Sequence, residues 1–405
     1  MNKLVRRAVV VSGGVVAAWL VVLVGLLFVR RLQRQPKRIN FPHAPLAPVQ
    51  VGEHELTIYN WGERVFSSML DDIQSGKSRI LMETYILRND EVGNTFRKRL
   101  ISRAQHGVHV YLIFDSLGSS SLPAKWRRFP RNIRTFEFGP VNSLKTLLKQ
   151  GFLTRTHRKI LLVDNNVAYL GGVNIGKEYR RRWRDTHLRL EGPLAHNVAH
   201  AFEEMWNQYH QEAKSMKFTP PVDDPCIEIC YNDPLQKEFP ILQQYIAAFE
   251  RAERTIRISS AYFLPPQPLY AALIAAAQRG VQVEVMTPER GDVVYADWGA
   301  RGLYEDLLAH GVCIWLYQQT VNHSKTCTID GRWSTIGSAN LDSLSMCYLF
   351  EINIFVHDEA FAAQMERMWE IDLQNCRQVV MEEWRKRSAV ERALEVAVLP
   401  LYRWM

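Results

Sequence analysis

The chain has few cysteines, a deficit of acidic residues and only one long uncharged run. Its six cysteines in 405 residues match no zinc-ligand spacing, and a chain this long needs no disulfide framework, so we expect free thiols in a reducing compartment. An apolar fraction of 47% and a charged fraction of 23% exclude a disordered or collagen-like chain, and the single run excludes a multi-span membrane protein. What remains is a globular protein large enough to be an enzyme, with a net charge of +8.

The uncharged run covers the 22 residues from 8 to 29. At about 1.5 Å per residue it is long enough to cross a hydrocarbon core of about 30 Å, so we predict a single transmembrane helix. A cleaved signal peptide and a buried helix are the alternatives, but a signal peptide has a shorter apolar region and a small-residue cleavage site. More basic residues follow the run than precede it: Lys3, Arg6 and Arg7 precede it, and Arg30, Arg31, Arg34, Lys37 and Arg38 follow. This excess predicts that the C-terminal side of the run is cytoplasmic. Prolines at 36, 42, 45 and 48 predict an extended stem over residues 30–50.

Beyond the stem, β-branched runs alternate with helical stretches. Two units of this kind are predicted, with strands at 79–87 and 108–114 around a helix at 91–105, and strands at 255–263 and 281–286 around a helix at 268–279. Each helix leads into a glycine, Gly107 or Gly280, as expected where a glycine ends a helix before a strand. The alternation predicts an α/β protein with a mostly parallel sheet.

An internal repeat is the strongest signal in the sequence. His157 and His323 each begin the pattern H-x-K-x4-D, 166 residues apart. If Lys and Asp each fill about one position in twenty, 12 histidines give one accidental match about 3% of the time, so two matches with shared flanking residues are far beyond accident. The same offset relates Gly171 to Gly337, Gly172 to Ser338, Asn174 to Asn340, and Asp185 to Glu351. We therefore predict a first repeat at 51–215, a second at 216–370 and a C-terminal helical extension at 371–405.

Each repeat offers the groups that a phosphoryl site needs. On a strand, a histidine and a lysine two residues apart point to the same face, so the ammonium can neutralise an anion that the imidazole touches. An asparagine in the following turn can add hydrogen bonds. For one copy alone, a solvated strand end would be the simpler interpretation, and the duplication is what overturns it. The predicted catalytic residues are His157, Lys159, Asp164, His323, Lys325 and Asp330, supported by Asn174, Asn340, Asp185 and Glu351.

Two imidazoles at one phosphate can catalyse phosphodiester exchange without a metal or cofactor. One neutral histidine attacks phosphorus, and the other, protonated, gives its proton to the departing alkoxide. Carboxylates orient such imidazoles. Asp185 and Glu351 are the better candidates for direct contact, whereas Asp164 and Asp330 can instead fix the strand-to-turn geometry. The sequence does not say which acid pairs with which histidine.

The two motifs resemble the paired signature of the phospholipase D superfamily, with Gly-Gly-Val-Asn at 171–174 and Gly-Ser-Ala-Asn at 337–340. The similarity covers nearly all of the chain after the stem, about residues 56–384. Several further stretches look more narrowly like bacterial cardiolipin synthases: Met82–Ile86, Asp115–Ser119, His157–Ile160, and Tyr179 followed by Trp183–His187. The departures are one predicted span where the longer members usually have two, and Gly172 where the superfamily often has serine.

This resemblance implies two phospholipase D-like α/β halves packed around a shared cleft. It implies transfer of a phosphatidyl group between phosphatidylglycerol molecules with release of glycerol, with His157 as the nucleophile and His323 as the acid and base. The expected location is the bacterial inner membrane, with the catalytic body on the cytoplasmic side. A membrane-tethered hydrolase or nuclease with the same chemistry is the alternative, and a noncatalytic scaffold ranks last because both motifs are complete. We do not expect nucleic acid as the partner.

Two basic segments suggest contact with lipid. The first surrounds the first motif, where the arginines form either a surface for anionic headgroups or a solvated charged face: Arg155, Arg158, Arg180, Arg181, Arg182 and Arg184. The second is the C-terminal stretch 379–405, for which a helix packed on the second half is the favoured interpretation before Leu399, while residues 399–405 suit a lipid interface.

Overall fold

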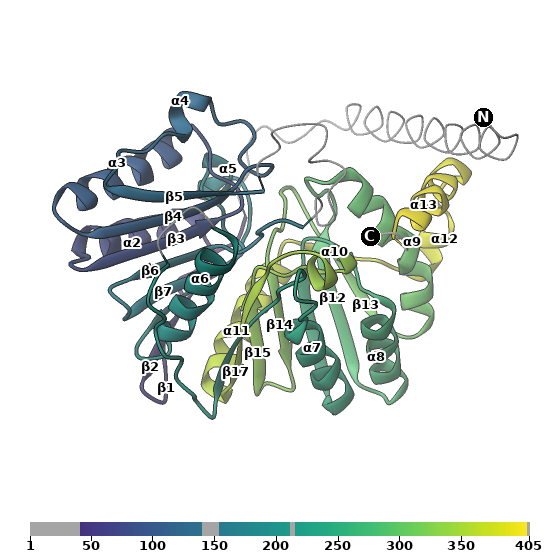
Figure 1. Cartoon of the computed structure of the whole chain (residues 1–405). Helices are drawn as coiled ribbons and strands as arrows, with labels where there is room; N and C mark the ends of the chain where they lie inside the picture. The colour runs from purple at the N-terminus through teal and green to yellow at the C-terminus, as the bar shows by residue number, and fades with distance from the viewer. Residues whose placement is uncertain (1–40, 140–153, 211–214, 403–405) are drawn as a thin grey trace, which may run out of the picture.

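A computed structural model describes residues 41–139, 154–210 and 215–402, which form two halves, each built on one eight-stranded sheet (Figure 1). In spatial order, the first sheet contains β1 (Val49–Val51), β2 (His54–Tyr59), β8 (His187–Glu191), β7 (Val167–Gly171), β6 (Ile160–Val163), β3 (Arg79–Thr84), β4 (His109–Asp115) and β5 (Ile133–Phe138). The second contains β18 (Cys376–Gln378), β13 (Cys313–Tyr317), β12 (Gln282–Pro288), β10 (Thr255–Ser260), β14 (Lys325–Ile329), β15 (Trp333–Gly337), β17 (Ile352–His357) and β9 (Ile227–Tyr231). A two-stranded sheet pairs β11 (Phe263–Leu264) with β16 (Leu341–Asp342).

Helices flank both sheets. In the first half these are α2 (Gly62–Ser75), α3 (Glu91–Gln105), α4 (Ala124–Arg127), α5 (Lys177–Arg181) and α6 (Ala195–Tyr209). In the second they are α7 (Pro240–Arg251), α8 (Gln267–Gln278), α9 (Val294–Ala309), α10 (Ser343–Cys347), α11 (Glu359–Leu373), α12 (Met381–Arg385) and α13 (Ala389–Tyr402). The predicted helices at 91–105 and 268–279 are confirmed as α3 and α8. Gly107 and Gly280 follow them with φ of 88° and 92°, the left-handed conformation in which glycine ends a helix without strain.

The two sheets confirm the duplication. From β2 to β5 and from β9 to β13, equivalent strands occur in the same spatial order with the same pairing directions. The predicted α/β class is therefore correct, but the mostly parallel sheet is wrong. Within the two eight-stranded sheets of the described residues, only β3–β4–β5 and β10–β12–β13 pair in parallel, whereas the motif strands pair antiparallel as the tight hairpins β6–β7 and β14–β15. A two- or three-residue turn can join only antiparallel strands. The alternation of strands and helices predicts parallel pairing correctly only for the βαβ part of each half.

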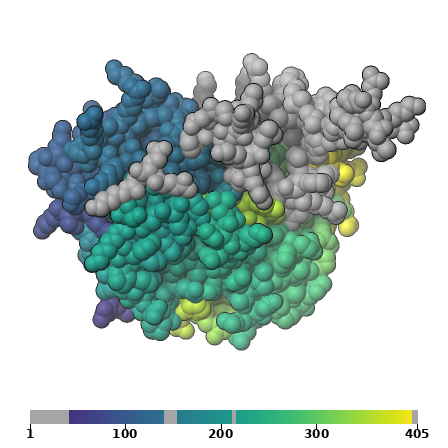
Figure 2. Space-filling model, in the orientation of Figure 1, coloured from purple at the N-terminus to yellow at the C-terminus, as the bar shows by residue number. Residues whose placement is uncertain are grey.

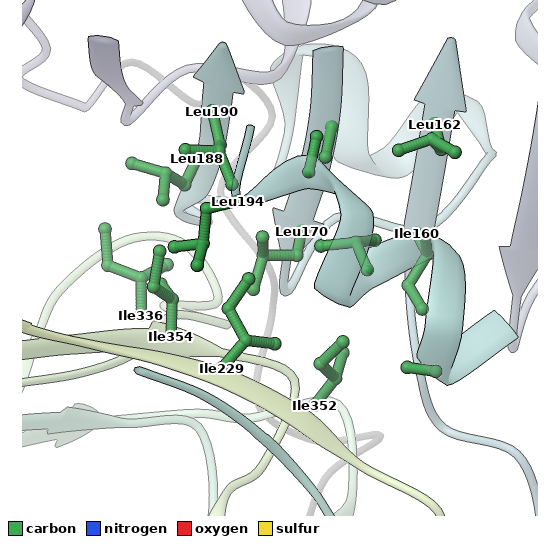
Figure 3. Packing of buried hydrophobic residues seen from close by; sticks show 14 of the residues in the cluster. Ile160, Leu162, Leu170, Leu188, Leu190, Leu194, Ile229, Ile336, Ile352 and Ile354 are labelled. Carbon is green, nitrogen blue, oxygen red and sulfur yellow. The ribbon is translucent and has the colours of Figure 1, made fainter. Parts of the chain in front are cut away.

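One apolar core joins the halves. Figure 3 shows Ile160, Leu162, Leu170, Leu188 and Leu190 of the first half meeting side chains of the second. These partners lie on β9, β15 and β17 and include Ile229, Ile336, Ile352 and Ile354. Each buried Leu or Ile contributes about 1.5–3 kcal/mol, so this shared core holds the two sheets against each other. On the face that Figure 2 shows, residues of both halves form one continuous surface.

The C-terminal segment packs on the second half. Val398 of α13 and Val294 and Trp298 of α9 form a small apolar cluster, and Arg301 pairs with Glu395 at 3.0 Å. This confirms the packed-helix interpretation for the part before Leu399. The segment is not purely helical as predicted, because Cys376–Gln378 joins the sheet as edge strand β18 beside β13.

Among the described residues, none of the helices combines the length and the apolar character that a membrane crossing requires. The predicted span at 8–29 and the stem as far as residue 40 lie outside the described residues, so both stay predictions.

Candidate active site

The segment before each motif histidine pairs with the other half of the molecule. Thr156 forms a parallel bridge with Phe350, and Asn322 forms one with Arg184. The amide of His157 donates to the carbonyl of Phe350 at 2.9 Å, and the amide of His323 donates to the carbonyl of Arg184 at 2.6 Å. Both members of one bridge lie 166 residues before or after a member of the other, so the sequence repeat becomes a two-fold arrangement in space.

These bridges bring an acid of each half to the histidine of the other. His157 Nδ1 lies 2.8 Å from Glu351 Oε1, and His323 Nδ1 lies 2.7 Å from Asp185 Oδ2. All four side chains are buried. The expected direct contact of Asp185 and Glu351 with the imidazoles is therefore seen, and the pairing that the sequence left open crosses between the halves. Because Nδ1 is engaged, Nε2 is the nitrogen left for chemistry on both rings.

The two motif lysines lie beside the histidines that precede them. Lys159 Nζ donates to the carbonyl oxygen of His157 at 2.6 Å, and Lys325 Nζ contacts the carbonyl oxygen of His323 and lies 3.1 Å from its Nδ1. Burial lowers the pKa of Lys159 to about 7 and also lowers that of Lys325. Two buried ammonium groups with lowered pKa values favour an anionic guest, which would restore their charge.

Burial and these lysines also keep the first histidine neutral. Burial, followed by the charges of Lys159 and Lys325, holds the pKa of His157 well below its ordinary value. The pKa of His323 is lowered by burial and by Lys325, but the negative charge of Asp185 opposes the decrease. A neutral imidazole is the form that attacks phosphorus, and an imidazole beside a carboxylate is the form that holds a proton.

The pKa values of the two acids, Asp185 and Glu351, also differ. Burial alone would raise the pKa of Asp185, yet the charge and hydrogen bond of His323 and the charge of Lys325 bring it below its ordinary value. Burial raises the pKa of Glu351 to about 8 despite the charge of Lys159. At neutral pH the His323 pair therefore carries a negative carboxylate, whereas the Glu351 carboxyl is mostly protonated.

Gly172 and Ser338 give the two acids different neighbours, although the Ser338 hydrogen bond lowers the pKa of Glu351 and only partly offsets the effect of burial. The Ser338 hydroxyl donates to Glu351 Oε2, so the second half adds a hydrogen bond to its acid. At the equivalent Gly172, a Cβ atom would fall 2.1 Å from Asp185 Oδ1, so a serine there would displace the acid that orients His323. The departure from the usual serine is thus required by the position of Asp185.

Aromatic rings line both histidines. The ring centroid of Tyr85 lies 4.9 Å from that of His157, and those of Trp183, Tyr179 and Tyr262 lie 5.5, 5.6 and 6.3 Å from that of His323. Tyr262 had no signal in the sequence, because it lies two residues after β10 and the residue two after the equivalent strand β3 is Ile86.

Asp164 and Asp330 are not brought to this cluster. Asp164 follows β6 and accepts hydrogen bonds from the amides of residues 77, 78 and 79 at 2.7–3.0 Å. Asp330 follows β14 and accepts them from the amides of residues 253, 254 and 255 at 2.7–2.9 Å. Their prediction as catalytic residues gives way to the alternative, in which they fix the strand-to-turn geometry. Both have a left-handed backbone, with φ of 50° and 54°, a conformation that aspartate adopts more readily than most residues.

The two asparagines have different surroundings. Asn174 Oδ1 accepts from the amide of Ile86 at 2.9 Å and its Nδ2 donates to the Tyr179 hydroxyl at 2.9 Å, so its side chain braces the loop after β3. Asn340 is equally buried, but within the described part of the chain its Oδ1 has no hydrogen-bond partner. Of the two, Asn340 has the amide oxygen that a bound group would satisfy.

The arginines around the first motif do not form one basic surface. Arg155, Arg158 and Arg184 are buried, and Arg180 and Arg181 pair with Glu63. Neither interpretation left open by the sequence, a surface for anionic headgroups or a solvated charged face, describes the whole group, because three members are buried and two pair with an acid. Arg181 and Arg182 are the exposed members.

Asp372 of α11 is a site-supporting residue that sequence reasoning missed. Its Oδ1 accepts from Arg184 Nε at 2.7 Å and its Oδ2 contacts Nη2, with both side chains buried. Arg184 directly precedes Asp185, so the ion pair fixes the backbone that presents this acid. The repeat gave no signal, since Trp206 stands 166 residues earlier.

Within the described ranges, no group of three or more His, Cys, Asp or Glu side chains has the arrangement of a metal site. The geometry shows two buried histidines, each held at Nδ1 by an acid of the opposite half and each followed by a buried lysine, which is the arrangement that the sequence motifs predict.

Known proteins are similar to this chain in sequence. The family model described as "Cardiolipin synthase, PLD-like domain" matches residues 69–206 and 245–372. A cardiolipin synthase of Clostridium perfringens is 31% identical over 358 residues, covering 84% of this chain and 74% of that protein. One of Geobacillus kaustophilus is 29% identical over 393 residues, covering 89% and 78%. The chain therefore belongs to the cardiolipin synthase family of PLD-like proteins, as its motifs predict, and it is an enzyme of this kind.

A solved structure shares the fold. Phosphatidylserine synthase of Haemophilus influenzae aligns with a TM-score of 0.66 at 14% identity, over 89% of this chain and 94% of that one. At this identity the likeness concerns the fold alone.

Proposed function

We propose that this enzyme transfers a phosphatidyl group from one phosphatidylglycerol molecule to another, forming cardiolipin and releasing glycerol. The observation that carries the proposal is the pair of buried histidines, each held at Nδ1 by an acid of the other half, with a buried lysine beside each. The relatives named cardiolipin synthase support the choice of lipid.

In the first step, His157 Nε2 attacks the phosphorus of the donor. The bond from phosphorus to the glycerol oxygen breaks, and His323 Nε2 gives its proton to that oxygen, so neutral glycerol leaves. Lys159 and Lys325 neutralise the phosphate oxygens, whose negative charge matches the two buried ammonium groups. The product is a phosphatidyl group bound to His157.

In the second step, His323 acts as a base. Its Nε2 takes the proton from the hydroxyl of a second phosphatidylglycerol, and that oxygen attacks phosphorus while the bond to His157 breaks. Asp185 stabilises the imidazolium that exists before the first step and after the second. The difference between the two acids supports these roles, because a pKa held low at Asp185 suits a proton-carrying His323, and a protonated Glu351 suits a neutral His157.

The proposed location is the bacterial inner membrane. Residues 8–29 would anchor the chain, and the basic residues after them favour a catalytic body on the cytoplasmic side. A bilayer is also where both substrates of the proposed reaction reside.

The test is a lipid assay with the full chain in phosphatidylglycerol vesicles containing a chelator. Cardiolipin and glycerol should form in equal amounts, His157→Ala should abolish both, and His106→Ala, which alters an exposed histidine on α3's C-terminal end, should leave them unchanged. Phosphatidic acid without cardiolipin would mean hydrolysis. Cleavage of DNA without lipid turnover would overturn the proposal in favour of a nuclease.

A further inference from the structure

Arg158 stands between the histidine and the lysine of the first motif, but its side chain makes contacts elsewhere. It is 2% exposed. Consecutive residues of an extended segment point to opposite sides, so Arg158 faces away from its two neighbours. Its Nη1 donates to the carbonyl oxygen of Ala201 on α6 at 3.0 Å, and its Nη2 donates to that of Asn232, directly after β9, at 3.1 Å. One buried guanidinium therefore connects the first motif to both halves of the molecule.

The contacts of Arg158 in the second half surround Glu351. The guanidinium carbon lies 5.0 Å from the ring centroid of Tyr231 and 5.5 Å from that of Phe350, which directly precedes Glu351. The amide of Asn232 donates to the carbonyl oxygen of Glu351 at 3.0 Å. Arg158 thus contacts both the residue before the acid and the residue that is hydrogen-bonded to the backbone of the acid.

A buried carboxyl of β3 accompanies this guanidinium. Glu83 is 1% exposed, and its Oε1 contacts the hydroxyl of Thr156, the residue that forms the bridge with Phe350. Burial raises the pKa of Glu83, and the charge of Arg158 is the largest influence that opposes this rise. The two charges therefore compensate each other in a buried place. If the guanidinium is removed, Glu83 can take up a proton, so the fold is not left with an unpaired charge.

The second half replaces this charged pair by uncharged residues. The equivalents of the pair are Ser324 and Ser259, whose hydroxyl oxygens lie 2.7 Å apart. The buried guanidinium of the second site comes instead from Arg184, which directly precedes Asp185. Each pair of histidine and acid thus has one buried guanidinium beside the backbone that presents its acid, supplied from a different position of the repeat.

We propose that Arg158 is a positioning residue for the attack on phosphorus. Through Phe350 and Asn232 it holds Glu351 against His157 Nδ1, so that Nε2 of this ring faces the phosphorus. The proposal rests on the role of His157 as nucleophile in the proposed function. Because a misplacement of about 1 Å can cost about a hundredfold in rate, loss of the guanidinium should slow the attack without weakening substrate binding.

The test measures the burst of p-nitrophenol that the full chain releases from bis(p-nitrophenyl) phosphate. The burst reports the attack, because this leaving group needs no proton from His323, and its amplitude counts the active sites. Arg158→Gln removes the guanidinium, and Arg158→Lys keeps a charge without the fork of two hydrogen bonds. The matched control is Arg97→Gln, because Arg97 on α3 also lies over two rings, those of Trp126 and Phe129, and donates to a backbone carbonyl.

We expect Arg158→Gln to lower the burst rate constant about tenfold to a hundredfold, with the amplitude and the half-saturating substrate concentration retained. Arg158→Lys should lower the rate constant at least about threefold, and Arg97→Gln should leave it unchanged. In a chain that already carries Glu351→Ala, Arg158→Gln should cost less than about twofold more, because both substitutions act on one pair. In a chain that carries Asp185→Asn, its full effect should remain.

A loss confined to the burst amplitude would show a role in folding alone and overturn the proposal. So would a wild-type rate constant in Arg158→Lys, an equal loss in Arg97→Gln, or an undiminished effect of Arg158→Gln beside Glu351→Ala. If Arg158→Gln does not fold, the same comparison with Arg158→Lys decides. Phosphatidic acid in place of cardiolipin from phosphatidylglycerol would instead overturn the proposed function, and the burst rate constants would be unaffected by that result.

Discussion

The two acids of the site should respond differently to the same chemical change. Asp185→Asn and Glu351→Gln each replace a carboxyl by an amide of the same shape. At pH 7 the first substitution removes a negative charge, because the pKa of Asp185 lies below its ordinary value. The second removes almost none, because burial raises the pKa of Glu351 to about 8 and the carboxyl is mostly protonated at pH 7.

The size of the difference follows from the geometry. His323 Nδ1 lies 2.7 Å from Asp185 Oδ2, which puts the centres of charge about 4 Å apart once His323 is protonated. At an effective dielectric constant of about 20, this attraction is about 4 kcal/mol. If this attraction is lost in the state in which His323 must hold a proton, the rate should fall about a thousandfold. Glu351→Gln retains a neutral hydrogen-bonding partner for His157 Nδ1 and should cost about tenfold or less at pH 7.

The assay is the initial rate of cardiolipin formation in phosphatidylglycerol vesicles between pH 6 and 9, with thermal melting as a check on folding. The ratio of the Glu351→Gln rate to the wild-type rate should stay constant below pH 8 and change above it, where the native carboxyl becomes charged. Asp185→Asn should be slow throughout. Equal losses for the two variants at pH 7, or a larger loss for Glu351→Gln, would refute the assignment of charge to the two pairs.

Two further predictions concern stability. Asp164→Asn and Asp330→Asn should each destabilise the fold by about 2–3 kcal/mol, since each carboxylate accepts three backbone hydrogen bonds, while the surviving folded protein keeps its kcat. Folding lowers the pKa of each carboxyl, so its contribution to the free energy of unfolding is present above the ordinary carboxyl pKa and is lost as pH falls through the folded value. The stability of the variants in urea should therefore depend less on pH than that of the wild type below about pH 4. Asp372→Ala leaves the buried Arg184 guanidinium unpaired and should cost about 3–5 kcal/mol, whereas Glu253→Ala at an exposed pair should cost at most about 1 kcal/mol. A loss of kcat without a loss of stability at Asp164 would return that residue to the chemistry, and equal stability costs for Asp372→Ala and Glu253→Ala would show that the Arg184 pair is not structural.

The repeat is the part of the fold that sequence predicts well. An offset of 166 residues that preserves histidine, lysine, glycine and asparagine can persist only if the two copies fold alike, and the matched sheets confirm it. The direction of the motif strands was missed because periodicity reports which residues are apolar and not which strand lies beside which. The turns at Asp164 and Asp330 are too short to join parallel strands, and this information lies in the spacing of the strands and not in their apolar pattern.

The site shows a similar division. Asp185 and Glu351 could be predicted as the acids that contact the imidazoles because the repeat preserves them. Their exchange between the halves could not, since it depends on the bridges of Thr156 with Phe350 and of Arg184 with Asn322, which are tertiary contacts. The arginines around the first motif could not be placed from the sequence for a different reason. Charge in a sequence carries no information on burial, and Arg184 finds its partner on α11, far along the chain.

The central claim is that His157 carries the phosphatidyl group between the two steps. The most direct measurement uses a phosphate-labelled donor, a rapid quench in alkali, where phosphohistidine survives, and mass spectrometry of the peptides. The wild type should carry label on His157, His157→Ala should carry none, and His323→Ala with a p-nitrophenyl donor should accumulate label on His157 because the second step lacks its base. Label on His323, or steady turnover of the wild type with no labelled histidine, would contradict the account.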